Sequence, residues 1–193
     1  MPANLILQIK KKVEDYHPLV VENYRYLHAH PELSYKEYHT SEFIQSQLSG
    51  LGIKFVSGIA GTGVLGIIEG KNPHKKIVAL RADMDALSIR ESNNISYKSQ
   101  NENVMHACGH DVHTASLLGV SRILNELKQE FEGTILLIFQ PGEEKHPGGA
   151  RLMLEAGVFN EYKPDLIIAQ HVYVDYRAGE VGFEPGIIMA AAD

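Results

Sequence analysis

The chain has little cysteine and no long apolar run. Its 193 residues include a single cysteine, which excludes an internal disulfide framework and fits a reducing compartment. No run approaches the roughly 18 apolar residues that a transmembrane helix requires. The N-terminal stretch carries its charges after a very short apolar segment, the reverse of a secretory signal. We therefore expect a cytoplasmic protein with no membrane partner.

Positive charge is also scarce. The chain has 18 Lys and Arg against 24 Asp and Glu, a formal net charge of −6, and its short basic run is residues 10–12 (KKK). Because nucleic-acid binding relies on clustered Lys and Arg side chains, this balance argues against a nucleic-acid partner. Hydrophobic residues make up 44% of the chain, which is enough for a sizeable core. No internal repeat or low-complexity segment is present.

Helical and strand-like patterns alternate along the chain. Apolar residues at helical spacing predict four helices, over residues 5–28 with a break at Pro18, 35–48, 113–130 and 147–157. Short apolar runs predict five strands, over residues 53–56, 63–69, 76–80, 134–139 and 165–169, the last two buried. Residues 30–34 and 91–103 are expected to be loops, the second with the option of a short hairpin. This order predicts an α/β fold, a three-layer sandwich whose mixed, mostly parallel sheet is covered by helices on both faces.

Side chains that bind metals are concentrated in residues 105–113 (MHACGHDVH), which hold three histidines, an aspartate and the cysteine. Cys108 and His110 flank Gly109, so both side chains can point to the same side of an extended chain. A neighbouring cation lowers the pKa of a thiol enough for the thiolate to bind it. A lone cysteine is more often simply buried, but the crowding of imidazoles here favours a divalent-metal site.

Two adjacent carboxylates, Glu143 and Glu144, follow a Pro-Gly turn after the predicted strand 134–139. Such a pair is most often a solvated turn, and Lys145 suits that interpretation. A hydrolytic metal site, however, needs one carboxylate to hold metal and another to take a proton from bound water. The position directly after a buried strand favours this second interpretation.

Other polar side chains follow other predicted strands. Asp83 and Asp85 share one facing by period two and suit the orientation of a ligand imidazole or support of the water. His171 follows the strand predicted over 165–169. In open α/β sheets, functional groups collect beyond the carboxyl ends of the strands. We therefore expect four donor segments to converge on one rim of the sheet.

Four motifs, taken in order, resemble those of the metal-dependent amidohydrolases in the aminoacylase/carboxypeptidase metallopeptidase family. They are residues 81–87 (RADMDAL), 105–113 (MHACGHDVH), 139–144 (FQPGEE) and 170–172 (QHV). The most similar branch contains hippurate hydrolase, N-acyl-amino-acid amidohydrolase and the plant auxin-conjugate hydrolases. The resemblance covers nearly the whole chain and implies a zinc-exopeptidase-like catalytic domain.

The resemblance also implies a site for two divalent metal ions, which could be zinc, manganese, cobalt or nickel. The implied ligands are Cys108, His110, Glu144 and His171. Glu143 would be the general base that activates a water and then protonates the leaving amine. Catalytic importance is also expected for Asp85, and a role in supporting the ligands for Asp83, Asp111 and His113.

The implied reaction is hydrolysis of the amide bond of an N-acyl amino acid or a similar peptide-like small molecule. Family members are longer, with an inserted lid or dimerisation domain followed by the rest of the catalytic domain and a final histidine ligand. We therefore expect residues 1–193 to be the N-terminal part of the catalytic domain, inactive alone, with the insertion due near residues 189–193. The full-length protein could form a homodimer.

Two other function classes stay open. One is a catalytically silent metal-binding or interaction module that retains the motifs, and the other is a hydrolase with Cys108 as nucleophile and a histidine as base. The chain also departs from the family pattern. Ser88 and Val174 stand at or near positions where proline is usual, and residues 145–149 replace a glycine-rich run. We expect the two proline departures to affect loop stiffness more than chemistry.

Overall fold

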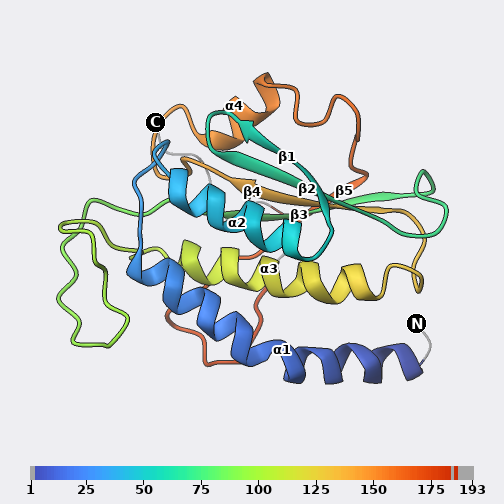
Figure 1. Cartoon of the computed structure of the whole chain (residues 1–193), viewed down its shortest axis with the longest axis horizontal. Helices are drawn as coiled ribbons and strands as arrows, with labels where there is room; N and C mark the ends of the chain where they lie inside the picture. Colours follow the sequence, from blue (N-terminus) through green and yellow to red (C-terminus); the bar gives the residue numbers. More distant parts are fainter. Residues whose placement is uncertain (1–2, 184, 187–193) are drawn as a thin grey trace.

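The computed structural model describes residues 3–183 and 185–186. They form four helices and five strands, in the order α1 (Ala3–Ala29), α2 (Tyr38–Gly50), β1 (Lys54–Ile59), β2 (Gly63–Glu69), β3 (Ile77–Asp83), α3 (His110–Glu126), β4 (Thr134–Gln140), α4 (Gly149–Glu155) and β5 (Leu166–Ala169) (Figure 1). None of the described helices is long and apolar enough to cross a membrane. Residues 189–193, where the resemblance places an insertion, lie outside the described part of the chain.

The strands form one mixed sheet in the order β1-β2-β4-β3-β5. β1 pairs with β2 and β2 with β4 in antiparallel fashion, whereas β3 is parallel to both β4 and β5. The α/β fold with a mixed sheet is therefore confirmed. Because β3, β4 and β5 run in the same direction, their carboxyl ends meet at one rim, where ligand sites form in such sheets.

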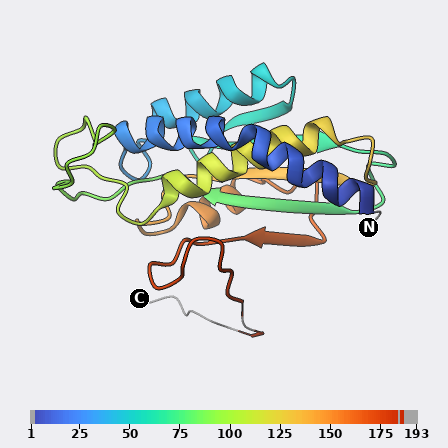
Figure 2. The ribbon, with the colours of Figure 1, turned by 90° about the horizontal axis from the view of Figure 1, so that it is seen from below.

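Helices cover both faces of the sheet and give three layers (Figure 1). Side chains alternate along β4, so Leu137 and Phe139 pack with α2 and α3, whereas Leu136 and Ile138 pack with Met153 of α4. α1 lies against the outer side of α3 (Figures 1 and 2). Because successive side chains of a strand point to opposite faces of the sheet, the same strand contributes apolar side chains to both cores.

The predicted break at Pro18 is wrong, because α1 continues through this residue. Proline lacks the N–H that would bond to the carbonyl of Glu14, and its ring crowds that carbonyl, which bends a helix. Pro18 is exposed, so water can solvate the freed carbonyl. Figure 1 shows a bend about midway along α1. Pro18 therefore changes the direction of the helix without ending it.

The third helix begins at His110, three residues before its apolar pattern. Gly109 precedes it with φ 87°, a left-handed conformation that glycine adopts without a steric penalty. His110, Asp111 and His113 consequently lie on the first turn of α3, while Cys108 lies outside it. α3 ends at Glu126, four residues before its predicted end. The ends of the remaining helices and strands differ from the prediction by at most three residues, and residues 91–103 form a loop with no hairpin.

β5 is exposed, in contrast to the buried strand that its apolar run predicts. Leu166, Ile167 and Ile168 are 48%, 50% and 49% exposed. The strand pairs with β3 at the border of the sheet, and no described residue pairs with its other edge (Figure 2). An apolar run predicts side chains that favour burial, but it does not show whether the described part of the chain covers them.

Leu137 is fully buried at the centre of the core between the sheet and the helices α2 and α3. We expect Leu137→Ala to lower the free energy of unfolding by about 2–5 kcal/mol, because the neighbouring side chains fill such a cavity incompletely. Leu154→Ala on α4 is the control, since Leu154 is 58% exposed. Urea unfolding measures both variants, and equal losses of stability would contradict this assignment of the core.

Candidate metal centre

The carboxyl ends of the parallel strands bring the predicted donors together. β3 leads to Asp83 and Asp85, β4 leads to the turn with residues 143–144, and His171 follows β5 by two residues. His110 opens α3 at the same rim. These segments are far apart along the chain and adjacent in space only because the three strands are parallel.

His110 lies at the centre of the group. Its Nε2 atom is 3.8 Å from Oε1 of Glu144 and 3.9 Å from Oε2 of Glu143. Donor atoms of His110, Cys108 and His171 lie within 4.8 Å of one another, and Cys108 Sγ is 3.4 Å from His171 Nε2. The four predicted ligands therefore lie together. Cys108, His110 and His171 form one trio of donors, and Glu144 joins His110 in another trio whose third member is Glu143.

Asp85 fixes the orientation of the His110 ring. The Nδ1–H of His110 donates to the backbone carbonyl of Asp85 at 2.9 Å, and Asp85 Oδ1 lies 3.2 Å from the same nitrogen. This arrangement assigns the free lone pair to Nε2, which is buried and has no hydrogen-bond partner among the described residues. An unpartnered buried nitrogen is costly. A divalent cation bound at Nε2 fits this donor set.

The charges around the thiol favour a cation as well. Burial, followed by the carboxylates of Glu144 and Glu143, raises the pKa of Cys108 to about 12. Burial and the charge of Glu144 likewise raise the pKa of Glu143. Thiols that act as nucleophiles lie in electropositive surroundings, the opposite of this one. The same surroundings attract a divalent cation, which would in turn favour the thiolate.

His113 is engaged by other groups. Its Nδ1–H donates to Asp83 Oδ1 at 2.6 Å, and its Nε2 accepts the backbone N–H of Val172 at 3.0 Å. Burial opposes ionisation of Asp83, but the hydrogen bond from His113 and the charge of Arg81 lower the pKa of Asp83 to about 2. With both ring nitrogens bonded, His113 supports the segment that carries His171, whose ring centroid lies 4.6 Å away.

Asp111 bonds to a side chain outside the proposed ligands. Its Oδ2 lies 2.7 Å from Nδ1 of His28, whose Nε2 is 3.2 Å from Oε1 of Glu91. The hydrogen bond from Asp111 raises the pKa of His28 against the opposing effect of burial, and Glu91 adds to the rise. This buried trio joins the end of α1 to the start of α3. The sequence offers no signal for it, because the partners of His28 are 63 and 83 residues away.

The loop before α2 also reaches the centre. The Ser34 hydroxyl donates to Asp85 Oδ2 at 2.6 Å, and the same oxygen accepts the backbone N–H of Glu144 at 3.0 Å. This contact leaves no pattern in the sequence, because the serine lies 51 residues from its partner.

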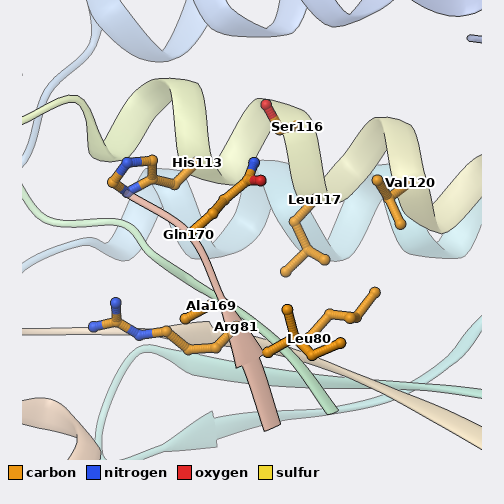
Figure 3. Close-up of a pocket in the computed structure, with 9 residues that line it drawn as sticks. Leu80, Arg81, His113, Ser116, Leu117, Val120, Ala169 and Gln170 are labelled. Carbon is orange, nitrogen blue, oxygen red and sulfur yellow. The ribbon is translucent and has the colours of Figure 1, made fainter. Parts of the chain in front are cut away.

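An open pocket lies between α3 and the β3–β5 pair, with His113 and Gln170 at one end (Figure 3). Leu117, Val120 and Ile168 give it apolar walls. Helical spacing predicts Val120 on the buried face of α3, but in the described chain the side chain is 38% exposed. The pocket adjoins the metal centre and contains none of its four predicted ligands.

Several known proteins are similar to this chain in sequence and fold. The model of Peptidase family M20/M25/M40 matches residues 79–186. The chain is 41% identical over 186 residues to the N-acyl-L-amino acid amidohydrolase of Geobacillus stearothermophilus, a match that covers 96% of this chain and 50% of that protein. It is 43% identical over 192 residues to thermostable carboxypeptidase 2 of Saccharolobus solfataricus, covering 98% of this chain and 48% of that protein.

The crystal structure of the Bacillus subtilis YXEP protein, a dinuclear metal binding peptidase from the M20 family, is also similar. It has a TM-score of 0.78 and 40% identity, covering 84% of this chain and 44% of that one. The chain thus spans about half the length of the relatives it matches. The region matched by the family model contains every candidate metal ligand described above, from Asp83 to His171. The chain belongs to Peptidase family M20/M25/M40.

Proposed function

We propose that the full-length protein is a metal-dependent amidohydrolase that cleaves N-acyl amino acids or similar peptide-like amides. The observation that carries this proposal is the group of donors around the buried, unpartnered Nε2 of His110. The printed names of two relatives, an N-acyl-L-amino acid amidohydrolase and a carboxypeptidase, support an amide as the bond cleaved. The proposed activity is that of the full-length protein, and residues 1–193 would be the N-terminal part of its catalytic domain.

Two divalent ions would be held at this site, with ligands from Cys108, His110, Glu144 and His171. Mixed thiolate, imidazole and carboxylate ligation suits zinc, manganese, cobalt or nickel. When bound, such ions polarise the scissile carbonyl and lower the pKa of a bound water. Asp85 acts through His110 and through the Glu144 backbone, so we assign it a positioning role.

Glu143 is the residue proposed to move the proton. Its carboxylate borders the donor group without a hydrogen bond that fixes it to another described side chain. Its raised pKa, caused by burial and by the neighbouring charge of Glu144, is the direction that a general base near neutral pH requires. Glu143 would take a proton from water and then deliver it to the nitrogen of the leaving amine.

One contact raises an alternative, a hydrolase with Cys108 as nucleophile. The 3.4 Å separation from His171 Nε2 would suit a thiol–imidazole pair. The pKa of about 12 for Cys108 argues against this alternative, since the thiolate is the attacking species. Glu143 and Glu144 would also have no role in it.

Chelation tests the proposal. We expect the full-length protein to hydrolyse N-acetyl- or N-benzoyl-amino acids, and an excess of chelator to lower the rate by about a hundredfold or more. Activity should return when zinc, manganese, cobalt or nickel is added back. Activity that survives the chelator but is lost on alkylation of Cys108 would establish the cysteine alternative. Metal binding without turnover would establish a catalytically silent module.

A further inference from the structure

The side chains of Ser34, Tyr35 and Glu37 link the loop before α2 to the loop that carries the two glutamates, directly or through Asp85. We call residues 34–37 the anchor segment and residues 141–148 the carboxylate loop. The carboxylate loop follows β4, and the anchor segment lies more than 100 residues earlier in the chain. Side chains of the anchor segment form hydrogen bonds with the carboxylate loop on both sides of Glu143 and Glu144.

Glu37 holds the loop at its start. The side chain is fully buried, and its Oε1 accepts the backbone N–H of Gly142 at 2.8 Å. Its Oε2 accepts the hydroxyl of Thr62 at 2.7 Å. A buried carboxylate is costly unless hydrogen bonds satisfy it, so this geometry is held firmly. It fixes the backbone one residue before Glu143.

Tyr35 holds the loop beyond the glutamates. Its hydroxyl donates to the carbonyl of Lys145 at 2.6 Å and accepts the N–H of Gly148 at 3.1 Å. The ring lies so close to Gly142 that an added Cβ there would be 2.2 Å from Tyr35 Cε1. Tyr35 also has φ 64°, a left-handed conformation that a bulky residue adopts rarely and that clusters at functional sites.

Ser34 completes the set through Asp85. Its hydroxyl and the N–H of Glu144 bond to the same oxygen, Asp85 Oδ2. The anchor segment therefore reaches the backbone of the carboxylate loop at Gly142, Glu144, Lys145 and Gly148, directly or through one side chain. Connecting loops are ordinarily mobile, whereas a catalytic carboxylate has to be held within a fraction of an ångström.

We propose that the anchor segment is a positioning element that fixes the carboxylate loop, and with it the carboxylates of Glu143 and Glu144, through Tyr35 and Glu37. Its catalytic consequence rests on the proposed function of Glu143. The anchoring itself does not, because it is a property of the backbone contacts. The two parts can therefore be tested separately in one set of variants.

The test uses Tyr35→Phe in the metal-loaded full-length protein, because this change removes only the hydroxyl. We expect amide hydrogen exchange of a peptide covering residues 142–148 to become at least several-fold faster, since Gly148 loses its acceptor and Lys145 its donor. For N-acetyl-amino acid hydrolysis we expect kcat to fall by about ten- to a hundredfold, with KM within about twofold, as for a misplaced catalytic group.

Tyr38→Phe is the matched control. Tyr38 lies three residues further on, is 60% exposed, and its hydroxyl makes no hydrogen bond among the described residues. Neither exchange nor kcat should change. Glu37→Gln keeps an oxygen for the Gly142 N–H, and the Thr62 hydroxyl can turn to accept from the new amide. It should retain most of the activity, whereas Glu37→Leu should behave like Tyr35→Phe.

Each outcome decides the proposal. Unchanged exchange in Tyr35→Phe overturns the anchoring, and faster exchange with unchanged kcat overturns the positioning role. Equal losses in Tyr35→Phe and Tyr38→Phe show a general loss of stability and also overturn it. If the wild-type protein hydrolyses no N-acyl amino acid, the proposed function fails, and the exchange rates alone decide whether the segment anchors the loop. Should Glu37→Leu not fold, the comparison of Tyr35→Phe with Glu37→Gln still applies.

Discussion

Glu143→Gln is expected to lower kcat for N-acyl amino acid hydrolysis by about 10²–10⁴-fold, the range typical of a lost general acid–base residue. The glutamine has nearly the same shape but cannot accept a proton from water at neutral pH. Glu143 lies beside the donor group, 3.9 Å from His110 Nε2, and is not among the four proposed ligands. The metal content of the variant should therefore stay the same.

Steady-state kinetics and metal analysis of the same full-length preparation measure the two quantities. Glu42→Gln on the exposed side of α2 is a suitable control, because the Glu42 side chain is 75% exposed and lies 3.6 Å from His39 at the surface. A Glu143→Gln variant that keeps its activity would require a different base. A variant that loses its metal would instead make Glu143 a ligand.

The second large effect concerns the two histidines on the first turn of α3. His110→Ala should lose at least one of the two metal ions on dialysis and lower kcat/KM by about a hundredfold or more, since the unpartnered Nε2 of His110 lies at the centre of the proposed ligands. His113→Ala should still bind metal, with an affinity lower by about 10–100-fold, the range found for residues that orient ligands. The difference arises because both ring nitrogens of His113 are already bonded.

Metal titration calorimetry on both full-length variants would measure these affinities, with far-UV circular dichroism to show that each variant is folded. Cys108→Ser provides an internal comparison, because it removes the soft ligand and leaves both histidines in place. Loss of metal from His113→Ala with normal binding by His110→Ala would contradict the assignment. Metal affinities equal to that of the wild-type protein in all three variants would place the metal elsewhere.

The local order of the chain was accessible from the sequence. The apolar run of residues 134–139 predicts β4, and helical spacing from Leu117 to Leu127 predicts α3, because secondary structure periods are local properties. The candidate metal ligands could also be grouped from the sequence. Glu144 and His171 follow strands, while Cys108 and His110 lie at the start of a helix, and in an α/β sheet these ends share one rim.

The ends and surroundings of these elements were less predictable. Pro18 bends α1 without breaking it because its site is exposed, and exposure depends on packing. β5 has the apolar composition of a buried strand, yet its described neighbours cover neither its free edge nor much of its side chains. A pattern of hydrophobicity records what a segment avoids, while the tertiary arrangement decides what covers it.

The sequence by itself therefore determined the fold class, the family and the set of candidate donors, because these depend on local periodicity and on motifs of adjacent residues. Only the tertiary structure showed that His113 is occupied by Asp83 and Val172, and that Tyr35 and Glu37 bond the loop of the two glutamates. These hydrogen bonds join residues tens of positions apart. They have no sequence period, and they exist only once the sheet register and the helix packing have brought donor and acceptor within 3 Å or so of each other.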